Sequence, residues 1–175
     1  MSEIQKTPNP ELGTVSATPR LVLYGSDVAL LERLKPYSTE LPYIAYETGY
    51  GPQATARAHL DAVWVNLMGA VELFGATPPF PLHEAQILRT PAAQLAKGFP
   101  RYGIAGVAVS QDDPNSPEFV VRLVMSALVK TVRDFNSVNQ HDLILRIGIL
   151  PDDLGLRKIK PDVVFQIVRE AYETS

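Results

Sequence analysis

Short apolar runs alternate along the chain with longer stretches of helical period. Runs bounded by glycine, proline or polar residues are typical of buried β-strands, and they lie at residues 21–24, 43–46, 61–66, 102–109 and 143–150. The run at 61–66 is apolar on both faces, which is typical of a central strand in a covered sheet. Residues 84–88 predict an edge strand.

The clearest helix begins near residue 116. Ser116 is placed to cap it and Pro117 occupies its first position. Apolar residues then recur at three- and four-residue steps and predict one inward stripe: Phe119, Val120, Leu123, Val124, Ala127, Leu128, Thr131, Val132 and Phe135.

Two further helices have clear boundary signals. One follows Asp27, which is placed to cap it, and ends before Pro36. The other opens at Pro161 and carries apolar residues on one side: Val163, Val164, Ile167, Val168 and Ala171.

Weaker signals mark the remaining segments. Short helical turns are predicted at 53–60 and 92–97, and the loop that follows the last strand is expected at 151–160. The pattern leaves residues 67–75 ambiguous.

The order of these elements predicts the fold class. Strands that alternate with helices indicate an α/β domain, three-layer α/β/α, with a mixed, largely parallel central sheet. We expect one such domain over residues 20–175, because 175 residues suit a single core. The polar, proline-containing segment 1–19 is expected to be a flexible tail.

Composition removes several classes of chemistry. The chain has no cysteine and only three histidines, at 59, 83 and 141, in no metal-binding spacing. We therefore expect no metal and no cofactor. The GxSxG, GxxxxGK[ST] and GxGxxG motifs are also absent, so neither a nucleophile elbow nor a common nucleotide-binding loop is predicted.

Charge and hydropathy limit the possible partners and locations. The net charge is −3 and the pI is about 5.6 without a basic cluster, which argues against bulk binding of nucleic acid. No apolar run is long enough to span a membrane, and the N-terminus lacks an apolar leader core. We expect a cytoplasmic protein.

Three predicted loops leave the carboxyl ends of strands, at residues 25–28, 66–75 and 151–156. Ligands of open α/β sheets bind beyond these ends. Two of the loops contain small residues, at Gly69, Ala70 and Gly155, which let backbone amides approach an anion. The loops predict a site for a phosphorylated small molecule, and tight turns without a ligand are the alternative.

Several segments, in order, resemble the macro domain, the ADP-ribose-binding α/β fold. LVLYGSDV at 21–28 is similar to that family's first strand and Gly-Asp-aliphatic turn, and DAVWVN at 61–66 resembles its Asp-Ala-aliphatic-Val-Asn strand. EAQILRTPAAQLAKGFPRYGIAG at 84–106 and IGILPDDLGLRKIK at 147–160 resemble the later strands, the second phosphate loop and the approach to the closing helix.

The resemblance implies a site for ADP-ribose or a related adenine nucleotide. Asp27 corresponds to the acidic residue that binds the adenine amine, and Val28 to the adjacent amide. The other matching positions belong to the end of the second strand and to the two phosphate loops: Asn66, Gly69, Ala70, Val71, Leu154 and Gly155. Asn66 is more often explained as a residue that ends a strand than as a ligand contact, and Trp64 before it is expected in the core.

Departures from the family pattern bear on catalysis. Hydrolytic members usually carry Asn-Ala-Ala-Asn, where this chain has Asn66-Leu67-Met68-Gly69. The resemblance therefore implies binding with weak or no catalysis. One alternative is a hydrolase of ADP-ribose derivatives or phosphate esters that uses Asp152 or Asp153 as a general base. Another is a protein-interaction scaffold without nucleotide that uses the proline- and phenylalanine-containing loop 74–81.

Overall fold

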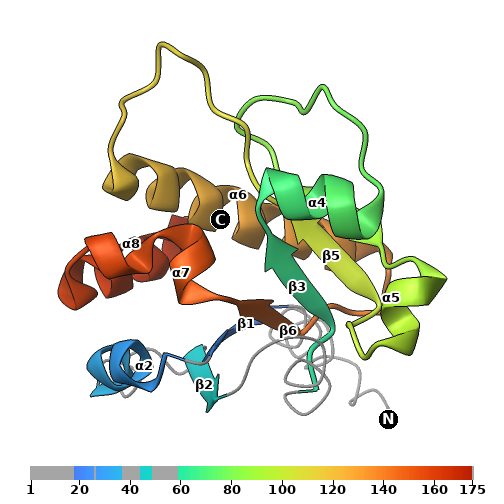
Figure 1. Cartoon of the computed structure of the whole chain (residues 1–175), viewed down its shortest axis with the longest axis horizontal. Coiled ribbons are helices and arrows are strands. Elements are labelled where there is room, and N and C mark those ends of the chain that lie inside the picture. The colour runs from blue at the N-terminus through green and yellow to red at the C-terminus, as the bar shows by residue number, and fades with distance from the viewer. Residues whose placement is uncertain (1–17, 26, 37–43, 49–58, 175) are drawn as a thin grey trace, which may run out of the picture.

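A six-stranded sheet forms the centre of the molecule (Figure 1). The computed structural model describes residues 18–25, 27–36, 44–48 and 59–174. Its strands lie in the order β2-β1-β6-β3-β5-β4, and every pairing is parallel except that of β4 with β5. The strands are β1 (Arg20–Gly25), β2 (Ile44–Thr48), β3 (Ala62–Val65), β4 (Gln86–Arg89), β5 (Tyr102–Ala105) and β6 (Arg146–Ile149). The predicted α/β fold with a mixed, largely parallel sheet is confirmed.

The helices agree with the predicted boundary signals. They are α2 (Val28–Leu34), α4 (Leu67–Phe74), α5 (Ala92–Ala96), α6 (Pro117–Val138), α7 (Pro151–Leu154), the 3-10 helix η3 (Leu156–Lys158) and α8 (Pro161–Thr174). Asp27 Oδ1 accepts a hydrogen bond from the Leu30 amide at 3.0 Å, and Ser116 Oγ accepts one from the Phe119 amide at 3.1 Å. Both predicted N-caps are confirmed.

Two segments expected to be irregular or left ambiguous are helical. The ambiguous residues 67–75 form α4, which Gly75 ends in the left-handed conformation at φ 71°. The loop expected at 151–160 holds α7 and η3. Residue 43 of the predicted second strand, residues 53–58 of the predicted helical turn and residues 1–17 of the predicted tail lie outside the described residues.

Hydrophobic clusters form on both faces of the sheet. On one face, alternate strand residues such as Leu21 and Trp64 join side chains from α2, α6 and α8. On the other face, residues such as Val22 and Val65 join Ala70 and Phe74 of α4. The sheet is therefore covered by apolar side chains on both faces, as its nearly continuous apolar strands require.

The buried face of α6 is turned relative to the predicted stripe. Its buried residues are Val121, Val124, Met125, Leu128, Val129, Val132 and Asn136. The prediction was right for Val124, Leu128 and Val132. Other predicted positions are half-buried and pack against the core: Val120, Leu123, Ala127 and Phe135. The prediction missed buried positions on the side where α6 packs against α8: Val121, Met125, Val129 and Asn136.

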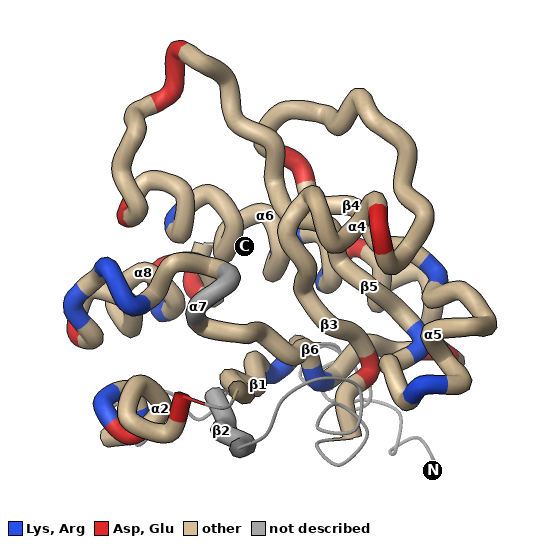
Figure 2. The backbone as a smooth tube through the Cα atoms, in the orientation of Figure 1, with Lys and Arg blue, Asp and Glu red and all other residues tan. Residues whose placement is uncertain are grey.

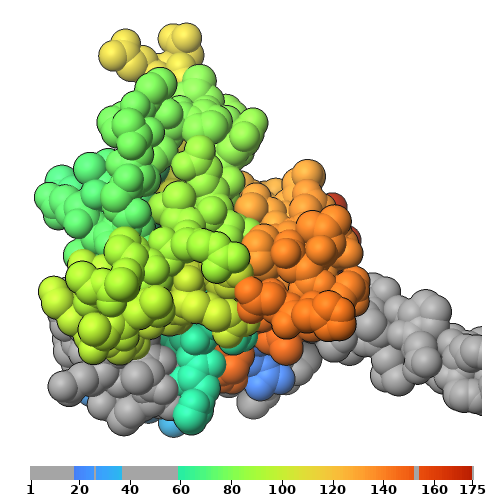
Figure 3. Space-filling model, turned by 90° about the vertical axis from the view of Figure 1, so that its right-hand side faces the viewer, coloured from blue at the N-terminus to red at the C-terminus, as the bar shows by residue number. Residues whose placement is uncertain are grey.

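A polar network ties together the starts of β3, β5 and β6. Asp61 accepts hydrogen bonds from the Leu145 and Arg146 amides at 2.9 and 3.0 Å and from Arg101 Nη1 at 3.1 Å. Arg101 also donates through Nε to Asp142 at 2.8 Å. Figure 3 shows the segment around α5 beside the segment that joins α6 to β6 on this side of the molecule. The aspartate of the DAVWVN motif therefore holds the amino edge of the sheet, opposite the strand ends that lead to the candidate site.

Gly103 on β5 allows α4 to lie against the sheet. A Cβ atom built on Gly103 would lie 2.5 Å from Phe74 Cε1. We expect Gly103→Ala to lower the free energy of unfolding by about 1–3 kcal/mol, because the ring must leave its position. Urea denaturation measures this change.

The matched control for that prediction is a double-mutant cycle with Phe74→Leu. A shorter side chain at position 74 leaves room for the added methyl group, so Gly103→Ala should cost clearly less in the Phe74→Leu background. Equal costs in the two backgrounds would contradict the assigned contact.

Candidate functional site

The sheet opens at its carboxyl edge between β3 and β6. These two strands pair only through Ala62 with Ile147 and Val63 with Gly148. On either side, pairing continues further: Val65 still pairs with Ala105 on β5, and β1 still pairs with Ile149. The last residues of β3 and β6 are therefore not joined to each other.

The chain leaves these two neighbouring strands toward opposite faces. β3 leads into α4, whose residues Ala70 and Phe74 pack on one face, whereas β6 leads into α7, whose Leu154 belongs to the cluster on the other face. Such a point, where the connections of adjacent strands diverge, is where open α/β sheets bind ligands. The topology thus marks the β3–β6 gap as the candidate site.

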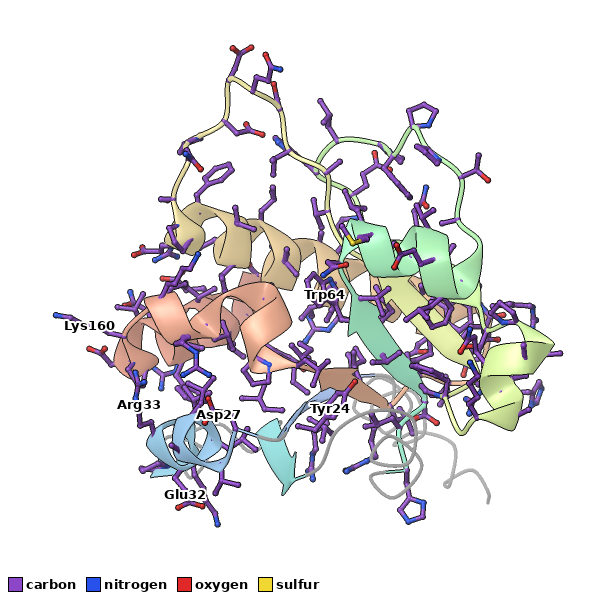
Figure 4. The ribbon with its side chains drawn as sticks, viewed as in Figure 1. Tyr24, Asp27, Glu32, Arg33, Trp64 and Lys160 are labelled. Atoms are coloured by element: carbon purple, nitrogen blue, oxygen red, sulfur yellow. The ribbon has the colours of Figure 1, made fainter. Side chains whose placement is uncertain are left out.

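A cavity of about 240 Å³ lies beside this point, at the carboxyl end of β3. Figure 4 shows Trp64 near the centre of the molecule, between the α7–α8 segment and α4. The lining comes from the end of β3 and the start of α4, the segment after β5, and helices α6 and α7: Trp64, Asn66, Leu67, Gly106, Val107, Val120, Val124 and Leu154. None of these side chains is charged, and β3 and β5 beside them carry no charged residue either (Figure 2).

The N-terminus of α4 supplies the polar groups of the cavity. Asn66 caps the helix: its Oδ1 accepts from the Gly69 amide at 2.8 Å and its carbonyl from the Ala70 amide at 2.9 Å. The amides of Leu67 and Met68 have no acceptor in the described part of the chain. Because first-turn amides carry the positive end of the helix dipole, this end of the cavity favours an anion.

Trp64 adds a second polar group without a partner. Its side chain lies in the lining and the residue is only 4% exposed, yet the indole Nε1 finds no hydrogen-bond acceptor among the described residues. Leaving a buried donor unpaired costs about 1–3 kcal/mol, so such a group is uncommon in a folded protein.

Gly106 brings the segment after β5 against the backbone of β3 and α4. A Cβ atom at this position would lie 3.2 Å from the Asn66 Cα and 3.3 Å from the Leu67 nitrogen. The absence of a side chain therefore sets the width of the cavity beside the α4 N-terminus.

The sequence-predicted phosphate-loop residues have mixed positions. Asn66 and Leu154 line the cavity. The amides of Gly69 and Ala70 are already bonded to Asn66, and Val71 lies within α4 with 41% of its surface exposed. The expected small-residue loop is thus a capped helix, and its two unpaired amides belong to Leu67 and Met68 instead.

Asp27 lies outside the cavity lining and is already engaged. Its Oδ1 receives the Leu30 amide and its Oδ2 forms an ion pair with Arg157 of η3. The hydrogen bond from Arg157, followed by that from Leu30, holds the pKa of Asp27 below its ordinary value. Val28, the other residue expected at adenine, begins α2 and is exposed.

The expected second phosphate loop, around Gly155, is compact. Gly155 links α7 to η3 in the left-handed conformation at φ 80°, with no neighbour within 4 Å of a built Cβ. Asp152 and Asp153 lie in α7, next to Leu154 of the lining. The orientation of their side chains is outside what the structure describes, so their proposed role as a general base stays a prediction.

The loop at 74–81 presents less aromatic surface than expected. Phe74 is buried and meets the Phe99 ring edge-on at a centroid distance of 6.2 Å. Phe80 is half-buried. A partner surface on this loop would therefore rest on its prolines rather than on Phe74.

The residues that sequence reasoning missed are those brought in by distant elements. Trp64 was assigned to the core alone, and Gly106, Val120 and Val124 were not connected with a site. Gly106, which follows a predicted strand core, is a usable signal, because a glycine after a strand allows close backbone approach.

The predicted absence of a metal site stays a prediction. The described residues contain no group of three His, Asp or Glu side chains that would hold a metal. Likewise, no helix in the described ranges is both long and apolar enough to cross a bilayer.

The Asp27–Arg157 pair predicts how stability depends on pH. Because the folded pKa of Asp27 is lowered, its contribution is fully present above the unfolded value of about 3.8 and is lost as pH falls through the folded value. Asp27→Asn keeps the helix cap but removes the charge. We expect the difference in free energy of unfolding between wild type and Asp27→Asn to become smaller below pH 4. Urea denaturation at a series of pH values measures this difference.

Arg157→Gln is the control for this pH dependence. It removes the cation, so most of the pH dependence of stability that Asp27 contributes should be lost. A gap between wild type and Asp27→Asn that stays constant from pH 6 to pH 2.5 would contradict the pairing.

The chain matches no protein-family model, no curated protein and no solved structure. Function is therefore inferred from the chemistry of the cavity, because a fold alone does not specify an activity.

Proposed function

We propose that the protein is a three-layer, macro-like module that binds ADP-ribose or a related adenine nucleotide in the cavity at the carboxyl end of β3. Catalysis is weak or absent in this proposal. The observation that carries it is the Leu67 amide in the first turn of α4, which has no acceptor among the described residues and belongs to a residue of the cavity lining.

An anionic group fits the α4 N-terminus better than a neutral one. The Leu67 amide is unpaired in the described part of the chain and belongs to the lining, and Asn66 holds the helix start in place through the Gly69 amide. The described residues of the lining include no acidic side chain, so none of them repels a phosphate. The net charge of −3 does not oppose this mode, because oriented amides supply the local field.

The size of the cavity suits one part of a nucleotide. Its volume of about 240 Å³ is below the roughly 300–1,000 Å³ of pockets that enclose a whole drug-sized ligand. We assign the cavity to the phosphate–ribose part. The adenine would extend along α7 and η3, since Leu154 lines the cavity and Arg157 on η3 reaches Asp27.

Asp27 would then contribute to adenine binding as a shared acceptor. Each carboxylate oxygen has more than one lone pair, so an adenine amine can bind an oxygen that also receives Arg157 or the Leu30 amide. This arrangement retains the residue that the family resemblance indicates.

Isothermal titration calorimetry with ADP-ribose tests the proposed function. We expect saturable heat with ADP-ribose and at least tenfold weaker binding of adenosine, because adenosine lacks the phosphates that the α4 amides receive. Absence of heat at millimolar ADP-ribose would contradict the proposal, and so would equal affinities for the two ligands.

Val120→Phe tests the location of the site. Val120 lines the cavity and is half-buried, so a larger ring there occupies space that the ligand needs. We expect at least a tenfold loss of ADP-ribose affinity in calorimetry without a lower melting temperature. The matched control is Val138→Phe at the far end of α6, where the side chain is 79% exposed, and this variant should bind like wild type.

A further inference from the structure

Trp64 presents a buried hydrogen-bond donor at the cavity. The indole Nε1 is enclosed and has no acceptor among the described residues. The other buried side-chain atom in this condition, Oε1 of Gln94, belongs to α5 and not to the cavity lining. Of the two, only the Trp64 donor is therefore associated with the candidate site.

The lining offers Trp64 no internal acceptor. Its neighbours Leu67, Val107, Val120, Val124 and Leu154 have apolar side chains, and Gly106 has none. Asn66 is the one amide side chain in the lining, and its oxygen receives the Gly69 amide at 2.8 Å. A ligand oxygen that enters the cavity and reaches this nitrogen would supply the missing acceptor.

The neighbouring amides indicate what that molecule carries. Trp64 lies three residues before Leu67 in the sequence, and both residues line the cavity. An indole N–H donates but never accepts, and a backbone amide N–H does the same. The two unpaired groups of the lining, the Trp64 indole and the Leu67 amide, therefore select acceptors rather than donors.

We infer that Trp64 is a specificity-determining residue whose indole N–H donates to a phosphate or hydroxyl oxygen of the bound ligand. The inference rests on the proposed function for the identity of the nucleotide, but it depends only on the cavity for the nature of the contact. The ligand class is thus a molecule whose buried part is a phosphate or a sugar phosphate.

Trp64 is the only tryptophan of the chain, so its indole gives a single cross-peak in a ¹⁵N–¹H spectrum of the uniformly labelled full-length protein. Titration with ADP-ribose should move this peak downfield and slow the exchange of its proton with water, because the N–H gains an acceptor. Parallel titrations with inorganic phosphate, ribose 5-phosphate and ribose distinguish a phosphate oxygen from a hydroxyl oxygen.

The outcomes separate this inference from the proposed function. If calorimetry shows ADP-ribose binding and the indole peak stays in place, the role of Trp64 is overturned and the proposed function stands. If ADP-ribose does not bind, the proposed function fails. In that case a peak moved by phosphate, ribose 5-phosphate or ribose still supports the Trp64 contact, and a peak moved by none of them overturns it.

Trp64→Phe gives the corresponding affinity measurement. Phenylalanine keeps an aromatic ring but has no N–H, and we expect about tenfold weaker ADP-ribose binding by calorimetry. Phe135→Leu is the control for a general loosening of the core, because Phe135 packs on Tyr102 at 5.2 Å and does not line the cavity. Unchanged affinity in Trp64→Phe would contradict the inference, as would an equal loss in Phe135→Leu.

Discussion

The early end of pairing between β3 and β6 is the constraint from which the site follows. The two strands separate after Val63 and Gly148, and their continuations diverge to opposite faces. A cavity at this position is therefore a consequence of topology and not of any one side chain.

The chemistry of the cavity depends on how the chain turns at Asn66. Asn66 follows a buried strand and caps α4, and its side-chain oxygen accepts the hydrogen bond of the third amide of the first turn, that of Gly69. The first and second amides are left without an acceptor among the described residues, and Leu67 lines the same cavity as Trp64. The result is a set of donors without matching acceptors, held rigidly by a strand, a helix and the close approach of Gly106.

Much of the fold was accessible from local sequence signals, whereas the site was accessible only in part. Caps at Asp27 and Ser116 and the prolines at helix starts set most boundaries correctly, since these signals act within a few residues. The face of α6 was misplaced because α8, which is distant in the sequence, determines which side is buried. Gly69 and Ala70 were read as loop residues, because small residues favour both phosphate loops and helix starts.

Trp64 illustrates the same limit. Its apolar neighbours in β3 correctly indicate a core position, and it is indeed buried. Nothing within β3 reveals that the acceptor for its N–H is missing, since that depends on α6, α7 and the segment after β5. A buried donor becomes evidence for a ligand only when all of its neighbours are known.

The central claim is that the cavity at the carboxyl end of β3 holds the anionic part of a nucleotide against the start of α4. A crystal structure of the protein with ADP-ribose tests this most directly. The account predicts a phosphate oxygen at about 2.7–3.2 Å from the amide nitrogen of Leu67 or Met68. A nucleotide bound elsewhere, with these amides facing only water, would contradict it.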